Sequence, residues 1–294
     1  DYTFNFSSLG QETVVTDFPS YYGKMRIHSD GRLIFINNNN LRVYDPTTNV
    51  WTDKSLSNYY YENFGMQLIN NVLYVATYQE IYKVDISDLD NITETLYVDF
   101  ASGHQLEGGF SVEGDNIVYN IYDSNSNDNN RKVYKKIGDA DPELLWAGGW
   151  CCYYPVLLDD KVYQVSSDSI RQIIDGVFSE EVYLGININN LQTTKHNGSI
   201  YVQPSGTSYS FDVAKLILPQ SWAPDAENPP TVTYESLPTS EDSEISSFDL
   251  DINTGNLFLV NSSNSNYSVS SYQLSQQIQI LAGETQGIFT INPV

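Results

Sequence analysis

Residues 25–36 read MRIHSDGRLIFI, which is a short strand-like run, a polar turn and a second run of β-branched and aromatic residues. Asp30 and Gly31 in the turn tolerate the positive φ angles that tight hairpins require. Short runs of this composition, bounded by turn residues, are typical of β-strands. The segment therefore predicts an antiparallel β-hairpin.

The same hairpin pattern recurs along the chain, with a period of roughly 40 to 45 residues. The other copies lie at residues 67–75, 111–119, 156–165, 194–202 and 250–259. Two further strand-like runs follow most copies, as at 81–85 and 95–98. Units of four strands with this period are typical of the blades of a β-propeller. We therefore predict an all-β fold of the β-propeller class.

The two ends of the chain fit a closed ring. Residues 287–291 resemble the first strand of a further unit, whereas 2–6 and 13–18 resemble the last two strands of one. Sharing a sheet between the termini removes exposed strand edges. We predict seven four-stranded blades, with six as the alternative because the seventh would lack a strand. Residues 1–294 are predicted to be one domain, with a Pro-rich insertion around residues 218–237.

One unit resembles a known repeat. Residues 43–51 read VYDPTTNVW, and this Tyr-Asp-Pro…Trp ending is similar to that of kelch-type propeller repeats. The other units match less closely, and the paired glycines of that family are mostly missing. The resemblance implies a propeller fold and no kelch-specific function.

The charge of the chain limits its partners. There are 14 basic against 37 acidic residues, for a formal net charge of −23. Such a field repels nucleic acids and anionic lipid surfaces. No run approaches the roughly 20 apolar residues of a membrane helix, so no membrane insertion is predicted. Because the remaining polar residues are mostly neutral, we predict a secreted or cell-surface location.

In a four-stranded blade, the loop that enters the first strand opens on the same face as the loop between strands two and three. On that face the sequence places many aromatic residues, which suit a glycan or another small polar or aromatic ligand. Some of the 23 tyrosines are expected to fill gaps between blades instead. The predicted ligand-binding residues are Tyr21, Tyr22, Tyr59, Tyr60, Tyr61, His104, Trp150, Cys151, Cys152, Tyr153 and Tyr154.

Cys151 and Cys152 are the only cysteines and are adjacent. Neighbouring Cα atoms lie about 3.8 Å apart, below the usual range for a disulfide, so a bond between them would be strained. An extracellular setting favours this disulfide, which would form a rigid platform between Trp150 and Tyr153. Two free thiols and intermolecular pairing are the alternatives. No cofactor is predicted.

No catalytic motif stands out, and His104 with Glu107 is the only acid–base pair that we single out. The histidines lie far from one another and from the cysteines, and residues 123–128 lack the glycine and glutamate of a calcium loop, so no metal site is predicted. The sequence favours non-catalytic binding of a glycan or small molecule. The alternatives are an extracellular polysaccharide lyase or hydrolase, and a structural or adhesive module that contacts another surface protein.

Overall fold

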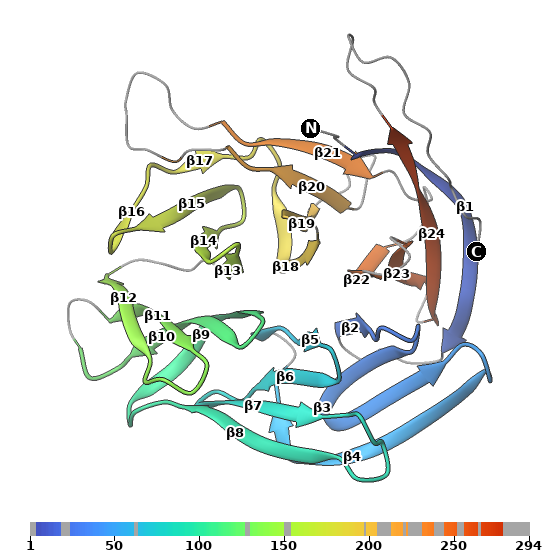
Figure 1. Ribbon diagram of the computed structural model, residues 1–294, viewed down its shortest axis with the longest axis horizontal. Helices are drawn as coiled ribbons and strands as arrows, with labels where there is room; N and C mark the ends of the chain where they lie inside the picture. The colour runs from blue at the N-terminus through green and yellow to red at the C-terminus, as the bar shows by residue number, and fades with distance from the viewer. Residues whose placement is uncertain are drawn as a thin grey trace.

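The computed structural model describes residues 4–18, 24–61, 64–126, 130–149, 154–196, 198–204, 213–219, 222, 231–237, 244–251, 256–263 and 266–278. These residues form six antiparallel sheets arranged around a central axis (Figure 1). No α-helix occurs in these ranges, and accordingly none there is long and apolar enough to cross a membrane. The described chain is a six-bladed β-propeller.

The strands follow the chain from blade to blade. The first sheet contains β2 (Lys24–Ile27), β3 (Leu33–Asp45) and β4 (Val50–Tyr60). The second contains β5 (Gln67–Ile69), β6 (Val72–Ala76), β7 (Glu80–Asp85) and β8 (Thr93–Asp99). The third contains β9 (His104–Glu113), β10 (Asn116–Asp123), β11 (Arg131–Ile137) and β12 (Glu143–Gly148). The fourth contains β13 (Tyr154–Leu158), β14 (Lys161–Val165), β15 (Ser169–Ile174), β16 (Val177–Phe178) and β17 (Val182–Tyr183). The fifth contains β18 (Ile188–His196), β19 (Ser199–Pro204), β20 (Val213–Ile217) and β21 (Thr233–Leu237), and the sixth β22 (Glu244–Leu250), β23 (Asn256–Ser263), β24 (Asn266–Ile278) and β1 (Phe4–Phe18).

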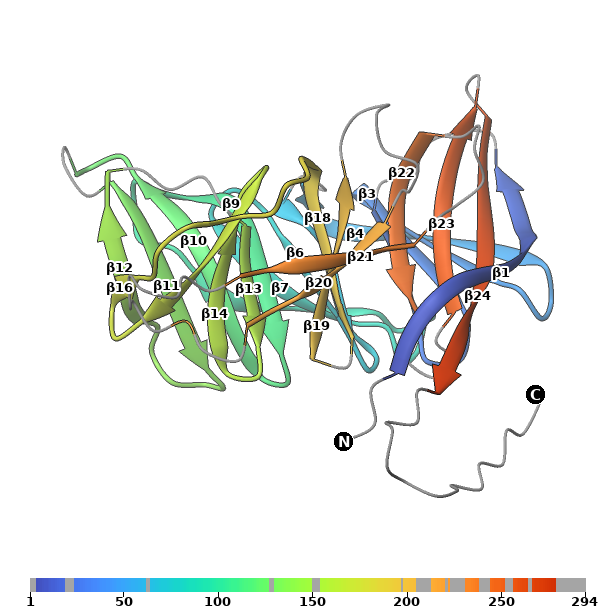
Figure 2. The same cartoon turned by 90° about the horizontal axis from the view of Figure 1, so that it is seen from above.

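The ring is closed by pairing of the two ends. β1 lies antiparallel to β24, with Thr13 opposite Ser271 and Phe18 opposite Tyr267, and it forms the outer strand of the sixth blade (Figure 1; Figure 2). The first strands contact one another in the closed order β2, β5, β9, β13, β18, β22 and back to β2. The prediction that the termini share a blade is therefore confirmed.

The preferred count of seven blades is wrong for the described residues, and the alternative of six is correct. The reason is that β1 completes the blade of β22, β23 and β24, so no N-terminal strand is left for another sheet. Residues 287–291, predicted to begin the seventh blade, lie outside the described residues.

Three blades differ from the predicted pattern. The fourth has five strands, because β16 and β17 both pair with β15. In the first, β3 is continuous through residues 37–40, where Asn38 has a φ of 60° and the register with β4 shifts, so this sheet has three strands. In the fifth, Thr233–Leu237 forms β21, which pairs with β20. The predicted insertion around 218–237 therefore ends before Thr233.

The core lies between adjacent blades, which explains why some strands are apolar at every position. Leu33 and Phe35 pack towards the sixth blade with Val260 and Val269, while Ile34 and Ile36 pack towards the second blade. The two faces of β3 are covered because a blade is sandwiched between two others. Each such buried side chain contributes about 1.5–3 kcal/mol.

Candidate functional site

The first strand of each blade has an open edge at the centre of the ring, and side chains from other blades bond to its backbone groups. The N–H of Met25 donates to Ser247 Oγ (2.9 Å). The N–H of Val112 donates to Gln67 Oε1 (2.8 Å). Buried backbone groups require such partners, so polar residues recur on strands that otherwise form the core.

The ring has two ends that the chain connectivity distinguishes. At the hairpin end, each first strand turns into the second. At the loop end, the chain enters the first strand and passes from the second strand to the third. In the third blade His104 is directly opposite Asp123, and the N–H of Ser124 donates to Gly103 O (2.9 Å). The two kinds of loop therefore share one face in this blade, as predicted.

An aromatic cluster lies at the loop end of the first and second blades and consists of Tyr59, Tyr61, Phe64 and Tyr78. The rings of Tyr61 and Tyr78 are 4.2 Å apart between centroids, and Tyr59 contacts Tyr61 edge-on at 5.2 Å. Phe64 lies 5.2 Å from Tyr78. Tyr59 is 52% exposed and Tyr78 is 48% exposed, while Phe64 is buried. The cluster thus has a fixed base and two rings open to solvent.

Backbone hydrogen bonds hold this cluster on three blades. The N–H of Tyr61 donates to Ala76 O (2.9 Å), and the N–H of Leu106 donates to Tyr78 O (2.7 Å). Tyr78 was not among the predicted site residues. It lies in the loop between the second and third strands of its blade, so the rule that groups these loops on one face would have included it.

The three consecutive tyrosines separate by strand alternation. Successive side chains of a strand point to opposite faces, so Tyr59 and Tyr61 lie together while Tyr60 points into the core. Tyr60 is 1% exposed and its hydroxyl donates to Glu94 Oε2 (2.5 Å). Burial, aided by the Glu94 carboxylate, raises the pKa of Tyr60. Tyr60 is therefore placed as a packing residue rather than on the predicted ligand surface.

Tyr154 approaches the cluster across Gly109. Gly109 has a φ of +103°, and a Cβ atom there would lie 2.7 Å from Phe64 O and 3.0 Å from Tyr154 Cε1. The absence of a side chain lets the segment before β5 and the start of β13 meet at one point of β9. Burial raises the pKa of Tyr154 to about 12. The structure thus brings Tyr59, Tyr61 and Tyr154 to one region of the loop end.

His104 contacts the carboxylate of Asp123, and Glu107 forms an ion pair with Arg131. His104 Nε2 lies 3.3 Å from Asp123 Oδ2, to which Lys132 Nζ also bonds at 2.6 Å. The hydrogen bond from Lys132 is the main cause that lowers the pKa of Asp123. Glu107 Oε2 lies 2.9 Å from Arg131 Nε. Both carboxylates therefore pair with cations of the fold, Asp123 with Lys132 and Glu107 with Arg131.

The other predicted site residues are Tyr21, Tyr22, Trp150, Cys151, Cys152 and Tyr153, and these lie outside the described residues. The disulfide between Cys151 and Cys152 stays a prediction. The described neighbours of that segment are Gly149, whose carbonyl accepts from Arg131 Nη1 (3.2 Å), and Tyr154 at the start of β13. Gly149 follows the last strand of the third blade, and Tyr154 begins the first strand of the fourth.

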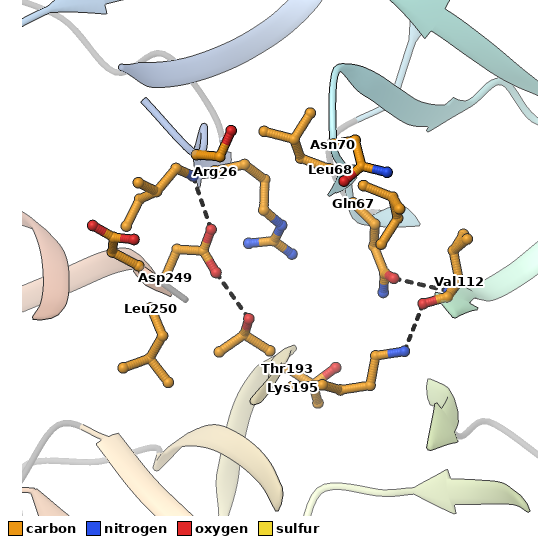
Figure 3. Close-up of a pocket in the computed structure, with 14 residues that line it drawn as sticks. Arg26, Gln67, Leu68, Asn70, Val112, Thr193, Lys195, Asp249 and Leu250 are labelled. Atoms are coloured by element: carbon orange, nitrogen blue, oxygen red, sulfur yellow. Dashed lines mark hydrogen bonds between the residues drawn. The ribbon is translucent and has the colours of Figure 1, made fainter. Parts of the chain in front are cut away.

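A pocket of about 220 Å³ lies at the hairpin end, between the first strands (Figure 3). Its lining comes from β2, β5, β9, β18 and β22 and the turns that follow them. Its polar and charged lining residues are Arg26, Ser29, Gln67, Asn70, Thr193, Thr194, Lys195, Asp249 and Asp251. None of these residues was predicted as a ligand contact, because binding was predicted on the opposite face.

Two cations enter the pocket from different blades. Arg26 Nε donates to Met66 O (2.6 Å) and its Nη1 to Met25 O (2.9 Å), and its guanidinium points towards the middle of the pocket (Figure 3). Lys195 Nζ donates to Val112 O and Leu157 O, at 2.6 Å each. Burial lowers the pKa of Lys195 to about 8.

Asp249 lies on β22 of the sixth blade, beside these cations, and bonds to the blades on either side. It accepts hydrogen bonds from the N–H of Ile27 (2.9 Å) and from Thr194 Oγ1 (2.8 Å). Burial raises its pKa, and the charge of Arg26 opposes that rise. The sequence did contain a signal for this pocket, namely a charged residue between apolar neighbours, as in Met25-Arg26-Ile27. Such a strand is buried on both faces, so its charged residue lies inside the molecule.

No protein-family model matches the chain, and no curated protein sequence matches it significantly. Solved structures do resemble it. Regucalcin from Agrobacterium tumefaciens, described as a calcium-binding protein, has 10% identity and a TM-score of 0.54 over 92% of this chain and 95% of that one. A calcium structure of a Trichoderma reesei carbohydrate-active enzyme of family AA12 has 11% identity and a TM-score of 0.56 over 90% and 95%.

A putative gluconolactonase has 9% identity and a TM-score of 0.54 over 91% of this chain and 93% of that chain. At such identities these similarities show a shared β-propeller fold and carry no information on the ligand.

No group of three or more metal-binding side chains occurs in the part of the chain that the structure describes. The central pocket does not fit calcium either, since Ca²⁺ requires six to eight oxygen ligands and Arg26 and Lys195 bring positive charge.

Proposed function

We propose that this propeller binds a glycan without catalysis, through the aromatic cluster at its loop end. The observation that carries the proposal is the pair of half-exposed tyrosines, Tyr59 and Tyr78, on either side of Tyr61. A sugar ring has apolar C–H faces and hydroxyl groups at its edge. Tyrosine combines an apolar ring with a polar hydroxyl, so it suits such a ligand.

The proposed surface extends from the cluster towards the fourth blade. Tyr154 approaches Phe64 through Gly109, and the sequence continues from Tyr154 back to Tyr153, Cys152, Cys151 and Trp150. We include these residues in the proposed site on the strength of that continuity. A surface with several aromatic contacts favours an oligosaccharide over a single sugar.

We also propose an extracellular or cell-surface location. The support is compositional: only 17% of residues are charged although the net charge is −23, so most of the polar surface is neutral. Fractionation of the producing cells tests this proposal, and recovery of the protein solely from inside the cells contradicts it.

The binding proposal is tested on a glycan array followed by titration calorimetry with the best ligand. We expect Tyr59→Ala and Tyr78→Ala each to weaken binding by about threefold to tenfold, since an aromatic contact is worth about 0.5–1.5 kcal/mol. Trp150→Ala tests the extension of the surface. Tyr183→Ala is the matched control, because Tyr183 is 71% exposed on β17 and lies outside the aromatic cluster.

Two results would contradict the proposal. One is the absence of any glycan binding by the wild-type protein at millimolar concentrations. The other is an equal effect of the control and the two cluster variants, which would show that the loss does not come from this surface. Turnover of a bound glycan that disappears in His104→Ala or Glu107→Gln would instead favour an enzyme.

A further inference from the structure

We propose that the central pocket at the hairpin end binds a small organic carboxylate between the guanidinium of Arg26 and the ammonium of Lys195. This site lies on the face opposite the aromatic cluster, and its ligand is anionic. The proposal is therefore independent of glycan binding, and either can fail alone.

The two cations line the same pocket. Arg26 comes from β2 and Lys195 from β18, and the ring closure brings them to one pocket (Figure 3). The two carbonyls that accept from Arg26 fix its guanidinium, which has five N–H donors and therefore retains donors for a ligand. Lys195 donates to two carbonyls, and an ammonium has a third donor.

The chemistry of the pocket favours a carboxylate over a phosphate. A guanidinium matches the planar carboxylate with two parallel hydrogen bonds. Asp249 and Asp251 line the same pocket, so a dianion meets more repulsion than a monoanion does. Burial raises the pKa of Asp249, which favours its neutral form and reduces its repulsion of an anion.

The size and apolar lining limit the rest of the ligand. A water molecule has a share of about 30 Å³ in the liquid, so a pocket of about 220 Å³ holds a small organic acid rather than an oligosaccharide. Leu68, Ile69 and Leu250 supply an apolar wall. We therefore expect a carboxylate with a short apolar or hydroxylated body.

The test is titration calorimetry of the whole protein with acetate, lactate and benzoate, each compared with its neutral amide, and with inorganic phosphate. We expect at least one of the carboxylates to bind saturably and at least tenfold more tightly than both its amide and phosphate. Arg26→Gln is expected to weaken binding at least tenfold, and Arg26→Lys to have an intermediate effect. Arg42→Gln is the control, since Arg42 on β3 pairs with Asp53 on β4 and does not line the pocket.

The proposal is overturned if none of the three carboxylates binds, if an amide or phosphate binds as tightly, or if Arg26→Gln binds like the wild type. Circular dichroism shows whether the variants fold. If the Arg26 variants do not fold, a crystal structure of the wild type with the bound carboxylate decides. A carboxylate within hydrogen-bond distance of Arg26 and Lys195 supports the proposal, and one bound elsewhere overturns it.

Discussion

Lys195 and Arg26 are cations whose closest partners are backbone carbonyls. A buried charge is tolerated only when it is well hydrogen-bonded, and each of these two side chains makes two such bonds at 2.6–2.9 Å. They therefore join first strands that belong to different blades. Both side chains also line the central pocket, so stability and the proposed ligand binding depend on the same two side chains.

The pKa of Lys195 makes stability depend on pH in a defined direction. Burial lowers this pKa from 10.5 to about 8. Between these values the unfolded chain holds a proton that the folded protein has released, so the contribution of Lys195 to the free energy of unfolding rises with pH from about 8 to 10.5. Below pH 8 the amine is charged in both states and this contribution is constant.

We expect wild type to gain stability relative to Lys195→Arg as the pH is raised from 8 to 10, because arginine keeps its proton throughout. Urea unfolding at several pH values measures the difference. Lys161→Arg is the control, since Lys161 is exposed at the start of β14. If the difference in unfolding free energy between wild type and Lys195→Arg stays constant over this pH range, the amine of Lys195 is not desolvated in the folded protein.

At the scale of an element, β9 shows how one irregular strand positions an aromatic surface. Gly108 and Gly109 have φ values of 75° and 103°, and the register between β9 and β10 shifts at this point. The shift places Gly109 under the backbone of Phe64 and the ring of Tyr154. A regular strand with a side chain at this position would hold these two aromatic residues apart.

We predict that Gly109→Ala destabilises the protein more than Gly114→Ala does. A left-handed backbone costs a residue with a Cβ about 1–2 kcal/mol, and this cost applies at both positions. Only Gly109 adds a contact of 2.7 Å with a backbone oxygen, whereas a Cβ at Gly114 meets nothing within 4 Å. Urea unfolding measures the two free energies, and equal losses would mean that Phe64 and Tyr154 move aside freely.

At the scale of the whole molecule, one pairing closes the ring. β1 and β24 come from opposite ends of the chain and pair along most of their length. Without β1, the edge of β24 would be exposed, and such edges pair with other chains. The aromatic cluster and the central pocket both draw on several blades, so both depend on this closure.

We expect deletion of residues 1–18 to lower the unfolding temperature and to cause self-association, as measured by light scattering. Deletion of residues 279–294 leaves the pairing of β1 with β24 in place, so we expect little change in either measurement. If the second deletion is as damaging as the first, the pairing of β1 with β24 is not what stabilises the ring.

Turn chemistry and strand alternation are local properties, and they were sufficient to predict the hairpins, the propeller class and the face shared by Gly103 and Ser124. The number of blades was not predictable in this way, because 2–6 and 13–18 look alike as strands whether they complete a sixth blade or begin a seventh. The central pocket was also out of reach, since Arg26, Lys195 and Asp249 are far apart in the chain and only ring closure brings them together. Pairing between distant strands decided both the number of blades and the position of the pocket, because this pairing depends on the geometry of all the blades at once.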